Sequence, residues 1–181
     1  MGERNDNAAD LSATFREAFR HHPSGVAVIS ADPGDGPVAL TVGSLISISA
    51  DPPTVAFSLS DQSTSSPAIL RAETLVVHFL RAENIGLARL GAARGANRFT
   101  AKTGWDRLPG GEPYFPEVRT RFLARRGESL SVKGATLVVA ELIAAAGPDA
   151  PDRPPLPEES SPEDSSIVYL NRDWHRLRPL D

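Results

Sequence analysis

The stretch of residues 38–60 constrains the fold of this chain more than any other. Its sequence, VALTVGSLISISADPPTVAFSLS, holds two runs rich in β-branched and small residues, separated by Asp51-Pro52-Pro53. Neither proline can donate a ladder hydrogen bond, so the chain is expected to turn there. The two runs therefore predict two strands joined by a turn in a mostly β domain.

The first run alternates between two kinds of side chain, which predicts a strand with two different faces. One face carries Leu40, Val42, Ile46 and Ile48 with Ser44, and the other carries Thr41, Gly43, Ser47 and Ser49 with Leu45. Such a strand can sit on a core and hold a flat polar ligand against its second face. A strand face turned to solvent has the same composition, so both interpretations stay open.

Length and charge narrow the class of protein. A chain of 181 residues suits one domain with a single core. The net charge of −4 argues against nucleic acid as the main partner, and the lack of cysteine removes disulfides, thiolate catalysis and Cys-ligated metal sites. No apolar run approaches the ~20 residues of a membrane helix. The polar N-terminus lacks a signal-peptide core, so we expect a cytoplasmic protein without a membrane partner.

The remaining patterns predict further elements in one domain over residues 10–181, preceded by a disordered stretch at 1–9. Leu11, Phe15, Ala18 and Phe19 fall on one face of a helix. Expected strands lie at 26–30, 75–80, 120–124, 135–144 and 167–170, the first forming a hairpin with the strand from Val38. Short helices are expected at 68–72, begun by Ser66 as N-cap, and at 83–90. Many short strands with few helices favour an antiparallel, Greek-key-like β-barrel.

Residues 147–166 differ from the rest in composition. They hold six prolines and seven charged residues, six of them acidic, with almost no apolar side chains. Such a segment cannot bury enough surface to fold alone, so it is expected to be a surface loop or an arm that reaches a partner.

The chain has few reactive side chains. His21, His22, His78 and His175 show no metal-ligand spacing, and no metal site is expected. His78 lies in an expected strand and is predicted to be in the core or on a sheet face. No serine-hydrolase elbow, phosphate-binding loop or dinucleotide-binding fingerprint is present. Such a protein either binds a partner or lets a cofactor supply the chemistry.

Several motifs, in order, resemble the flavin reductase family. They are GVAVI at 25–29, TVGSLISISADPP at 41–53, VAFSLS at 55–60, NRF at 97–99, TLVVAEL at 136–142 and IVYL at 167–170. The resemblance covers residues 15–178, and Ser-x-Ser-x-Asp-Pro-Pro is its most specific part. It implies an FMN-binding split β-barrel that supplies reduced flavin to a two-component monooxygenase.

The resemblance also implies a set of flavin-binding residues. They are Thr41, Val42, Gly43, Ser44, Ser58, Leu59, Ser60, Ser63, Thr64, Ser65, Arg98 and Phe99. The first four would follow the flavin ring and ribityl chain, and Ser58, Leu59 and Ser60 would flank the ribityl chain and phosphate. Ser63, Thr64 and Ser65 would offer hydroxyls and N–H groups to the phosphate, Arg98 would supply charge to it, and Phe99 would provide a packing surface. Ser63–Ser65 are equally compatible with a loop and helix cap, and Arg98 with a solvated surface charge.

Two positions depart from the family pattern. Gly43-Ser44 stands where the family has two hydroxyl residues, and Ala135 stands where it has a histidine associated with the nicotinamide. Loss of that imidazole removes a positioning group near the flavin. Lys133 and His78 are candidates to replace it.

The resemblance implies an NAD(P)H:flavin oxidoreductase that uses FMN, or alternatively FAD, with NADH or NADPH as the hydride donor. A homodimer is expected, with the flavin near the subunit interface and residues 147–166 wrapping the second subunit. A separate monooxygenase would receive the reduced flavin. Two alternatives stay open, a flavin carrier without catalysis and an interaction module that binds no cofactor.

Overall fold

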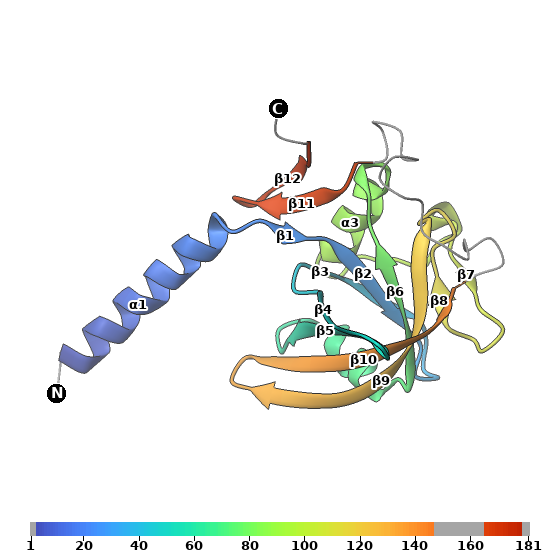
Figure 1. Cartoon of the computed structure of the whole chain (residues 1–181), viewed down its shortest axis with the longest axis horizontal. Helices are drawn as coiled ribbons and strands as arrows, with labels where there is room; N and C mark the ends of the chain where they lie inside the picture. The colour runs from blue at the N-terminus through green and yellow to red at the C-terminus, as the bar shows by residue number, and fades with distance from the viewer. Residues whose placement is uncertain (1–2, 147–164, 179–181) are drawn as a thin grey trace.

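The computed structural model describes residues 3–146 and 165–178, with the side chains of 3–9 left out, and its described part is mostly β. The helices are α1 (Glu3–Arg20), α2 (Ser66–Arg71) and α3 (Ile85–Ala92), with 3₁₀ turns η1 (Ala82–Asn84) and η2 (Ala101–Thr103). Figure 1 shows a curved β body from which α1 projects to one side. No helix in the described part is long and apolar enough to cross a membrane.

Seven strands form the main sheet, in the order β3-β2-β6-β9-β10-β5-β4. They are β2 (Ala27–Ala31), β3 (Val38–Val42), β4 (Ile46–Ala50), β5 (Pro53–Ser60), β6 (Thr74–Phe79), β9 (Thr120–Val132) and β10 (Ala135–Ala145). Every pairing in this sheet is antiparallel. The expected mostly β fold with few helices is confirmed, as is the hairpin of β2 with β3.

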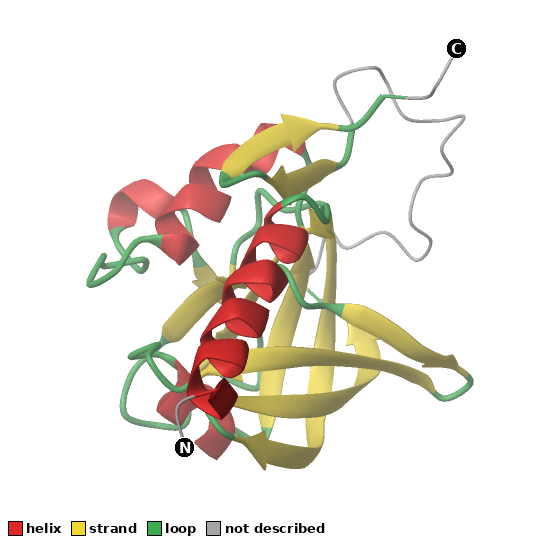
Figure 2. Cartoon of the chain, turned by 90° about the vertical axis from the view of Figure 1, so that its left-hand side faces the viewer, coloured by secondary structure: helices red, strands yellow, loops and turns green. Residues whose placement is uncertain are grey.

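The two edge strands of this sheet are neighbours in sequence. Only residues 43–45 join β3 to β4, so the sheet must curl until its edges approach each other. No hydrogen-bonded ladder joins β3 to β4 in the described residues, so strand pairing does not close the sheet. Figure 2 shows the curled sheet with the long β9–β10 hairpin reaching beyond the body.

Two small sheets complete the β structure. A three-stranded sheet has the order β1-β11-β12, with β1 (Ser24–Gly25), β11 (Ile167–Leu170) and β12 (Asp173–Arg176). The third is the pair β7 (Asp106–Arg107) and β8 (Pro113–Tyr114). The expected strand at 167–170 is thus present, and β11 and β12 form a C-terminal hairpin beside α3 (Figure 1).

Apolar side chains of the curled sheet form the largest core cluster. Its fully buried members include Ile29, Phe57, Leu75 and Val138. These strands are rich in β-branched and aromatic residues, which pack well on a pleated surface. A second cluster, around Val28 and Phe115, joins the sheet to α3 and to Trp174 of β12. This second cluster fixes α3 and the C-terminal hairpin on one side of β3.

The run at 38–49 differs from the expected single strand. It breaks at residues 43–45, so β3 and β4 lie at opposite edges of the sheet. Leu40 and Val42 are buried, whereas Ile46 and Ile48 are each 54% exposed. The predicted common apolar face is therefore wrong, because the break at Gly43 lets β4 turn its isoleucines outward.

Other boundaries also differ. Helix α1 begins at Glu3, so the backbone of residues 3–9 is helical where disorder was expected. Helix α2 is preceded by Ser65 rather than Ser66 at the N-cap. Strand β9 runs through Val132, well past the expected 120–124, because it pairs with β10 along most of its length. The expected arm at 147–166 lies outside the described residues except for Ser165 and Ser166, of which Ser166 forms a β-bridge with Arg81.

The described part of the chain leaves the apolar face of α1 exposed. Leu11, Phe15 and Phe19 are 69%, 56% and 59% exposed. The expected amphipathic helix is present, but residues 10–146 and 165–178 do not bury its apolar stripe. An apolar stripe of this kind marks a surface that another molecule can cover.

Candidate functional site

A pocket of about 640 Å³ opens where β3, the end of β5, the end of α3 and the β9–β10 turn meet. We call it the hydroxyl pocket, because serine and threonine residues line much of it. Its lining residues are Leu40, Thr41, Val42, Gly43, Ser44, Ser58, Ser60, Gln62, Ser63, Thr64, Gly91, Ala92, Ala93, Arg94, Arg98, Gly134 and Ala135. Hydroxyl groups, small side chains and two arginines suit a polar ligand with an anionic end.

Close packing of β3 against α3 forms one wall of the hydroxyl pocket. The Thr41 hydroxyl donates a hydrogen bond to the Ala88 carbonyl at 2.8 Å. Gly91 permits this approach, because a Cβ there would overlap Thr41 Oγ1 and lie 3.1 Å from the Thr41 backbone nitrogen. The wall therefore depends on a glycine in the last turn of α3.

The opposite wall is held by hydrogen bonds across the break between β3 and β4. The Ser58 N–H donates to Ser44 Oγ at 2.9 Å, and the Ser44 hydroxyl donates to the Ser58 carbonyl at 3.4 Å. This side chain extends the pairing of β5 beyond the end of β4. Ser44 is thereby fixed next to Gly43 at the base of the pocket.

The loop after β5 forms the polar end of the pocket. The Ser60 carbonyl accepts hydrogen bonds from the Ser63 N–H at 3.1 Å and the Ser66 hydroxyl at 2.8 Å. The Asp61 N–H donates to the Gly134 carbonyl at 3.1 Å, which ties the loop to the β9–β10 turn. These bonds fix the loop so that Ser60, Ser63 and Thr64 face the pocket.

Two arginines line the same pocket but differ in their contacts. Arg98 donates to the carbonyls of Gly91 (3.3 and 3.1 Å), Ala93 (2.7 Å) and Ala96 (3.0 Å), so most of its donors hold the segment after α3. Partial burial lowers the pKa of Arg98 below its usual value. Arg94 makes no hydrogen bond or ion pair within the described part of the chain. Its guanidinium is available to an anion.

Nine of the twelve residues expected to bind flavin line the hydroxyl pocket. Three do not. Leu59 is buried in the main core, and Ser65 is buried with its hydroxyl donating to the Ala39 carbonyl at 3.3 Å. Phe99 stacks on Phe115 and packs edge-on against Trp105, with ring centroids 5.6 and 5.1 Å apart. Strand alternation turns Leu59 inward between Ser58 and Ser60.

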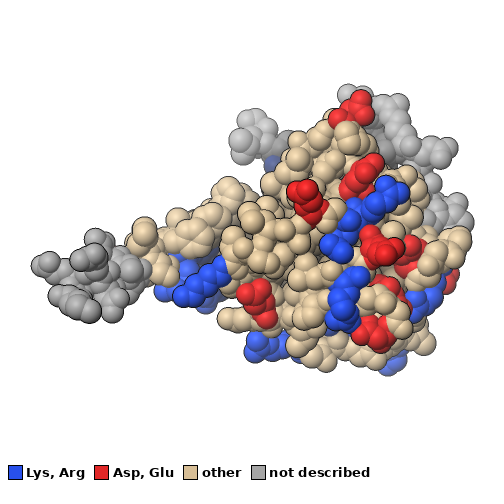
Figure 3. Space-filling view, turned by 90° about the horizontal axis from the view of Figure 1, so that it is seen from below, with Lys and Arg blue, Asp and Glu red and all other residues tan. Residues whose placement is uncertain are grey.

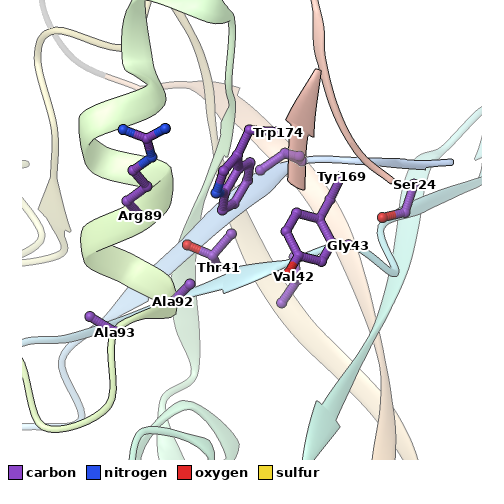
Figure 4. Close-up of a pocket in the computed structure, with 10 residues that line it drawn as sticks. Ser24, Thr41, Val42, Gly43, Arg89, Ala92, Ala93, Tyr169 and Trp174 are labelled. Carbon is purple, nitrogen blue, oxygen red and sulfur yellow. The ribbon is translucent and has the colours of Figure 1, made fainter. Parts of the chain in front are cut away.

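Two further pockets meet the hydroxyl pocket at Gly43. The aromatic pocket, about 470 Å³, is lined by Ser24, Val26, Thr41, Val42, Gly43, Arg89, Ala92, Ala93, Tyr169 and Trp174 (Figure 4). The arginine pocket, about 710 Å³, is lined by Arg16, Phe19, Arg20, His22, Pro23, Ser24, Gly25, Gly43, Ser44, Leu45, Ile46, Ser58, Tyr169, Asn171 and Arg172. Three hollows with different chemistry thus converge on one glycine.

His78 lies outside all three pockets. It is fully buried, and its Nε2 accepts a hydrogen bond from the Phe115 N–H at 3.1 Å while Nδ1 lies 3.1 Å from the Val28 carbonyl. Burial lowers its pKa to about 4, and the nearby Arg121 cation acts in the same direction. The ring is therefore neutral and structural. The core placement is confirmed, whereas the idea that His78 replaces the family histidine is wrong.

Several lining residues were missed by the sequence reasoning. Gly91, Ala92, Ala93 and Arg94 belong to the end of α3 and enter the pocket only because α3 packs on β3. The one sequence feature that pointed to this part of the pocket was Arg94, an isolated arginine beside Gly95 that follows an expected helix. Ala135 does line the pocket, whereas Lys133 is exposed in the neighbouring turn and does not.

Comparison with known proteins bears on what this arrangement binds. The protein-family model described as the flavin reductase like domain matches residues 19–177 of the chain. The chain belongs to the flavin reductase family. It is 35% identical over 166 residues to the NADH:FMN oxidoreductase of Rhodococcus qingshengii, covering 92% of this chain and 82% of that protein.

Two more similarities extend this placement of the flavin reductase chain. It is 32% identical over 138 residues to the FMN reductase (NADH) SmoA of Agrobacterium fabrum, covering 76% of this chain and 78% of that one. The crystal structure of a flavin reductase domain protein from Arthrobacter sp. FB24 superposes with a TM-score of 0.80 at 29% identity, over 94% of this chain and 98% of that one. The likeness therefore extends over nearly all of the chain.

Proposed function

We propose that this member of the flavin reductase family is an NAD(P)H:FMN oxidoreductase that binds FMN in the hydroxyl pocket. The observation that supports this proposal most is that nine expected flavin contacts, from β3, β5 and three loops, line one pocket of about 640 Å³. The named relatives are an NADH:FMN oxidoreductase and an FMN reductase (NADH). They favour catalysis over a flavin carrier or a module without cofactor.

The residues present fit FMN. Gly134 leaves open space where a side chain would project, and Gly43 and Ala135 keep the neighbouring lining small. The hydroxyls of Ser60, Ser63 and Thr64 suit the phosphate end. When bound, the flavin supplies the redox chemistry by accepting a hydride from the nicotinamide at N5. The chain's part is to hold the ring along β3 and to leave one face open to the donor.

We propose that hydride transfer here proceeds without an imidazole at the nicotinamide side. Ala135, at the position of the family histidine, lines the pocket with a methyl group, and none of the described residues lining the hydroxyl pocket is a histidine. Positioning of the donor must then come from contacts farther from the reacting atoms. Reduced flavin would leave for a separate monooxygenase, as the family implies.

We further propose that the curled sheet is a split barrel and that the protein is a homodimer. Register places Ser58, Leu137 and Leu130 in one row across β5, β10 and β9, and Ser60, Ala135 and Val132 in the next. Leu130, Val132 and Ile46 are 62%, 54% and 54% exposed. This apolar face borders the hydroxyl pocket, so a second copy could cover both. Figure 3 shows the molecule from below. Most of the charged side chains visible on this face lie away from α1.

The function is tested by steady-state oxidation of NADH with and without added FMN. The proposal predicts NADH consumption that saturates with FMN and is absent without it. FMN that binds, detected by quenching of its fluorescence, but never supports NADH oxidation would favour the carrier. Lack of any FMN binding would favour the interaction module and contradict the proposal.

Replacing Arg94 by alanine is expected to weaken FMN binding by about 10- to 150-fold, because a charge-assisted hydrogen bond is worth about 1.5–3 kcal/mol. Riboflavin, which lacks the phosphate, should bind the variant and the wild type equally. The melting temperature should stay unchanged, since Arg94 has no partner in the described chain. Lys102→Ala, at an exposed cation outside the pockets, is the control. If Arg94→Ala weakened the binding of riboflavin as much as that of FMN, Arg94 would not bind the phosphate.

Replacing Leu130 and Val132 together by aspartate is expected to convert a dimer into a monomer. Both side chains are more than half exposed, and a buried unpaired charge is costly at an interface. Light scattering coupled to gel filtration gives the mass directly. Leu177→Asp, at a half-exposed leucine near the C-terminal end of the described chain, is the control. A wild-type monomer would contradict the homodimer.

A further inference from the structure

The aromatic pocket opens onto the strand that carries three of the proposed flavin contacts. It shares Thr41, Val42 and Gly43 with the hydroxyl pocket. Its far side is built by Arg89 of α3 and by Tyr169 and Trp174 of the C-terminal hairpin. Figure 4 shows Trp174 between Arg89 and Tyr169, above Thr41 and Val42. A ligand lying over β3 at Gly43 can therefore continue into the aromatic pocket.

The two rings form a platform for a flat ring system. Tyr169 pairs with Trp174 across β11 and β12, and their ring centroids lie 4.9 Å apart at an interplanar angle of 60°. Trp174 is anchored against the second core cluster, whereas Tyr169 remains 38% exposed. Aromatic side chains on a fixed hairpin are well suited to stack on a base, because every base offers a π-face.

Arg89 supplies the charge that a nucleotide requires. It is exposed on α3 and makes no hydrogen bond or ion pair with any residue in the described ranges. Its position in the last turn of α3 places a cation beside the aromatic platform. A planar guanidinium binds phosphate oxygens through two parallel hydrogen bonds. Ser24, on the other side, adds a hydroxyl.

We infer that the aromatic pocket binds the adenosine phosphate half of the hydride donor, with the base stacked on Tyr169 and Trp174 and a phosphate paired with Arg89. The inference rests on the proposed function, since it assumes that the nicotinamide half lies over the flavin near Gly43. A cavity of about 470 Å³ is within the usual size of small-molecule sites, about 300–1,000 Å³. This distant anchor would supply the positioning that Ala135 does not.

Adenosine phosphate is also part of FAD, so the test must separate donor from flavin. Arg89→Ala and Tyr169→Ala are assayed in the full chain loaded with FMN, with Lys102→Ala as the control. Donors are NADH and reduced nicotinamide mononucleotide, which lacks the adenosine half. Each variant is expected to raise the KM for NADH roughly tenfold, the scale of one stacked base or phosphate contact, and to leave kcat unchanged. Turnover with the mononucleotide and the Kd for FMN should not change.

Binding of ADP-ribose to the FMN-loaded protein, measured by calorimetry, needs no turnover. We expect wild-type binding that Arg89→Ala and Tyr169→Ala each weaken. The inference would be overturned if the variants left the KM for NADH unchanged or lost activity equally with NADH and with the mononucleotide. It would also be overturned if they lowered only the affinity for FAD. ADP-ribose binding without any NADH oxidation would uphold this pocket and refute the proposed function. Oxidation of NADH without ADP-ribose binding would do the reverse.

Discussion

Gly91→Ala is expected to lower the free energy of unfolding by about 1–3 kcal/mol and to weaken FMN binding. The new Cβ would overlap Thr41 Oγ1 and lie 3.1 Å from the Thr41 backbone nitrogen, which cannot rotate away. Thr41 would lose its 2.8 Å hydrogen bond to the Ala88 carbonyl, and β3 would move away from α3. Both residues line the hydroxyl pocket, so this wall of the pocket would move with them. Chemical denaturation and fluorescence titration with FMN measure the two effects.

Gly86→Ala is the matched control for this change. Gly86 lies in the same helix, and a Cβ there would meet nothing within 4 Å. Alanine is favoured over glycine in a helix by about 1 kcal/mol, so this variant should be as stable as the wild type or more so. FMN affinity should not change. Similar behaviour of the two variants would show that the Gly91–Thr41 contact does not shape the pocket.

His78 is expected to make stability depend on pH well above the acid range of carboxylates. Its pKa is about 4 in the folded chain and near 6.5 when unfolded, a gap worth about 3 kcal/mol. As pH falls below the unfolded value, the unfolded chain takes up the proton first, so stability is lost progressively until the folded pKa is passed. We expect about 2 kcal/mol of this loss at about pH 5.

His78→Gln removes the titration and keeps an amide that can donate and accept. The wild type should lose stability relative to this variant as pH is lowered from neutral, measured by urea denaturation at each pH. His175→Gln, at an exposed histidine, controls for the loss of one imidazole. Parallel profiles for the wild type and His78→Gln would contradict the buried neutral ring. FMN binding at neutral pH should survive if the variant folds, because His78 lies outside the pockets.

The sequence reasoning found the part of the site that is local in the chain. One motif and the loop that follows it build most of the pocket. The lining residues predicted from this segment are Thr41–Ser44, Ser58, Ser60, Ser63 and Thr64. Leu59 was included because motif matching does not separate the two faces of a strand, and alternation alone would have excluded it. Ser65 was included although its hydroxyl is used by the Ala39 carbonyl.

The pocket residues that could not be predicted from the sequence are placed by contacts between distant segments. Arg94 and Arg89 reach their pockets because Thr41 binds the end of α3, a contact spanning 47 positions along the chain. Tyr169 and Trp174 arrive from the C-terminal hairpin. The exposure of Phe15 and Phe19 on α1 also escaped prediction, because an apolar stripe does not reveal whether its partner belongs to the same molecule.

Anaerobic mixing of the FMN-loaded protein with NADH, followed by visible absorption, tests the central claim most directly. The account predicts rapid loss of the oxidised-flavin band, slowed when the transferred hydrogen of NADH is replaced by deuterium. That result would establish direct hydride transfer in a pocket without an imidazole at Ala135. A flavin band that shifts on binding but stays oxidised after NADH is added would contradict it.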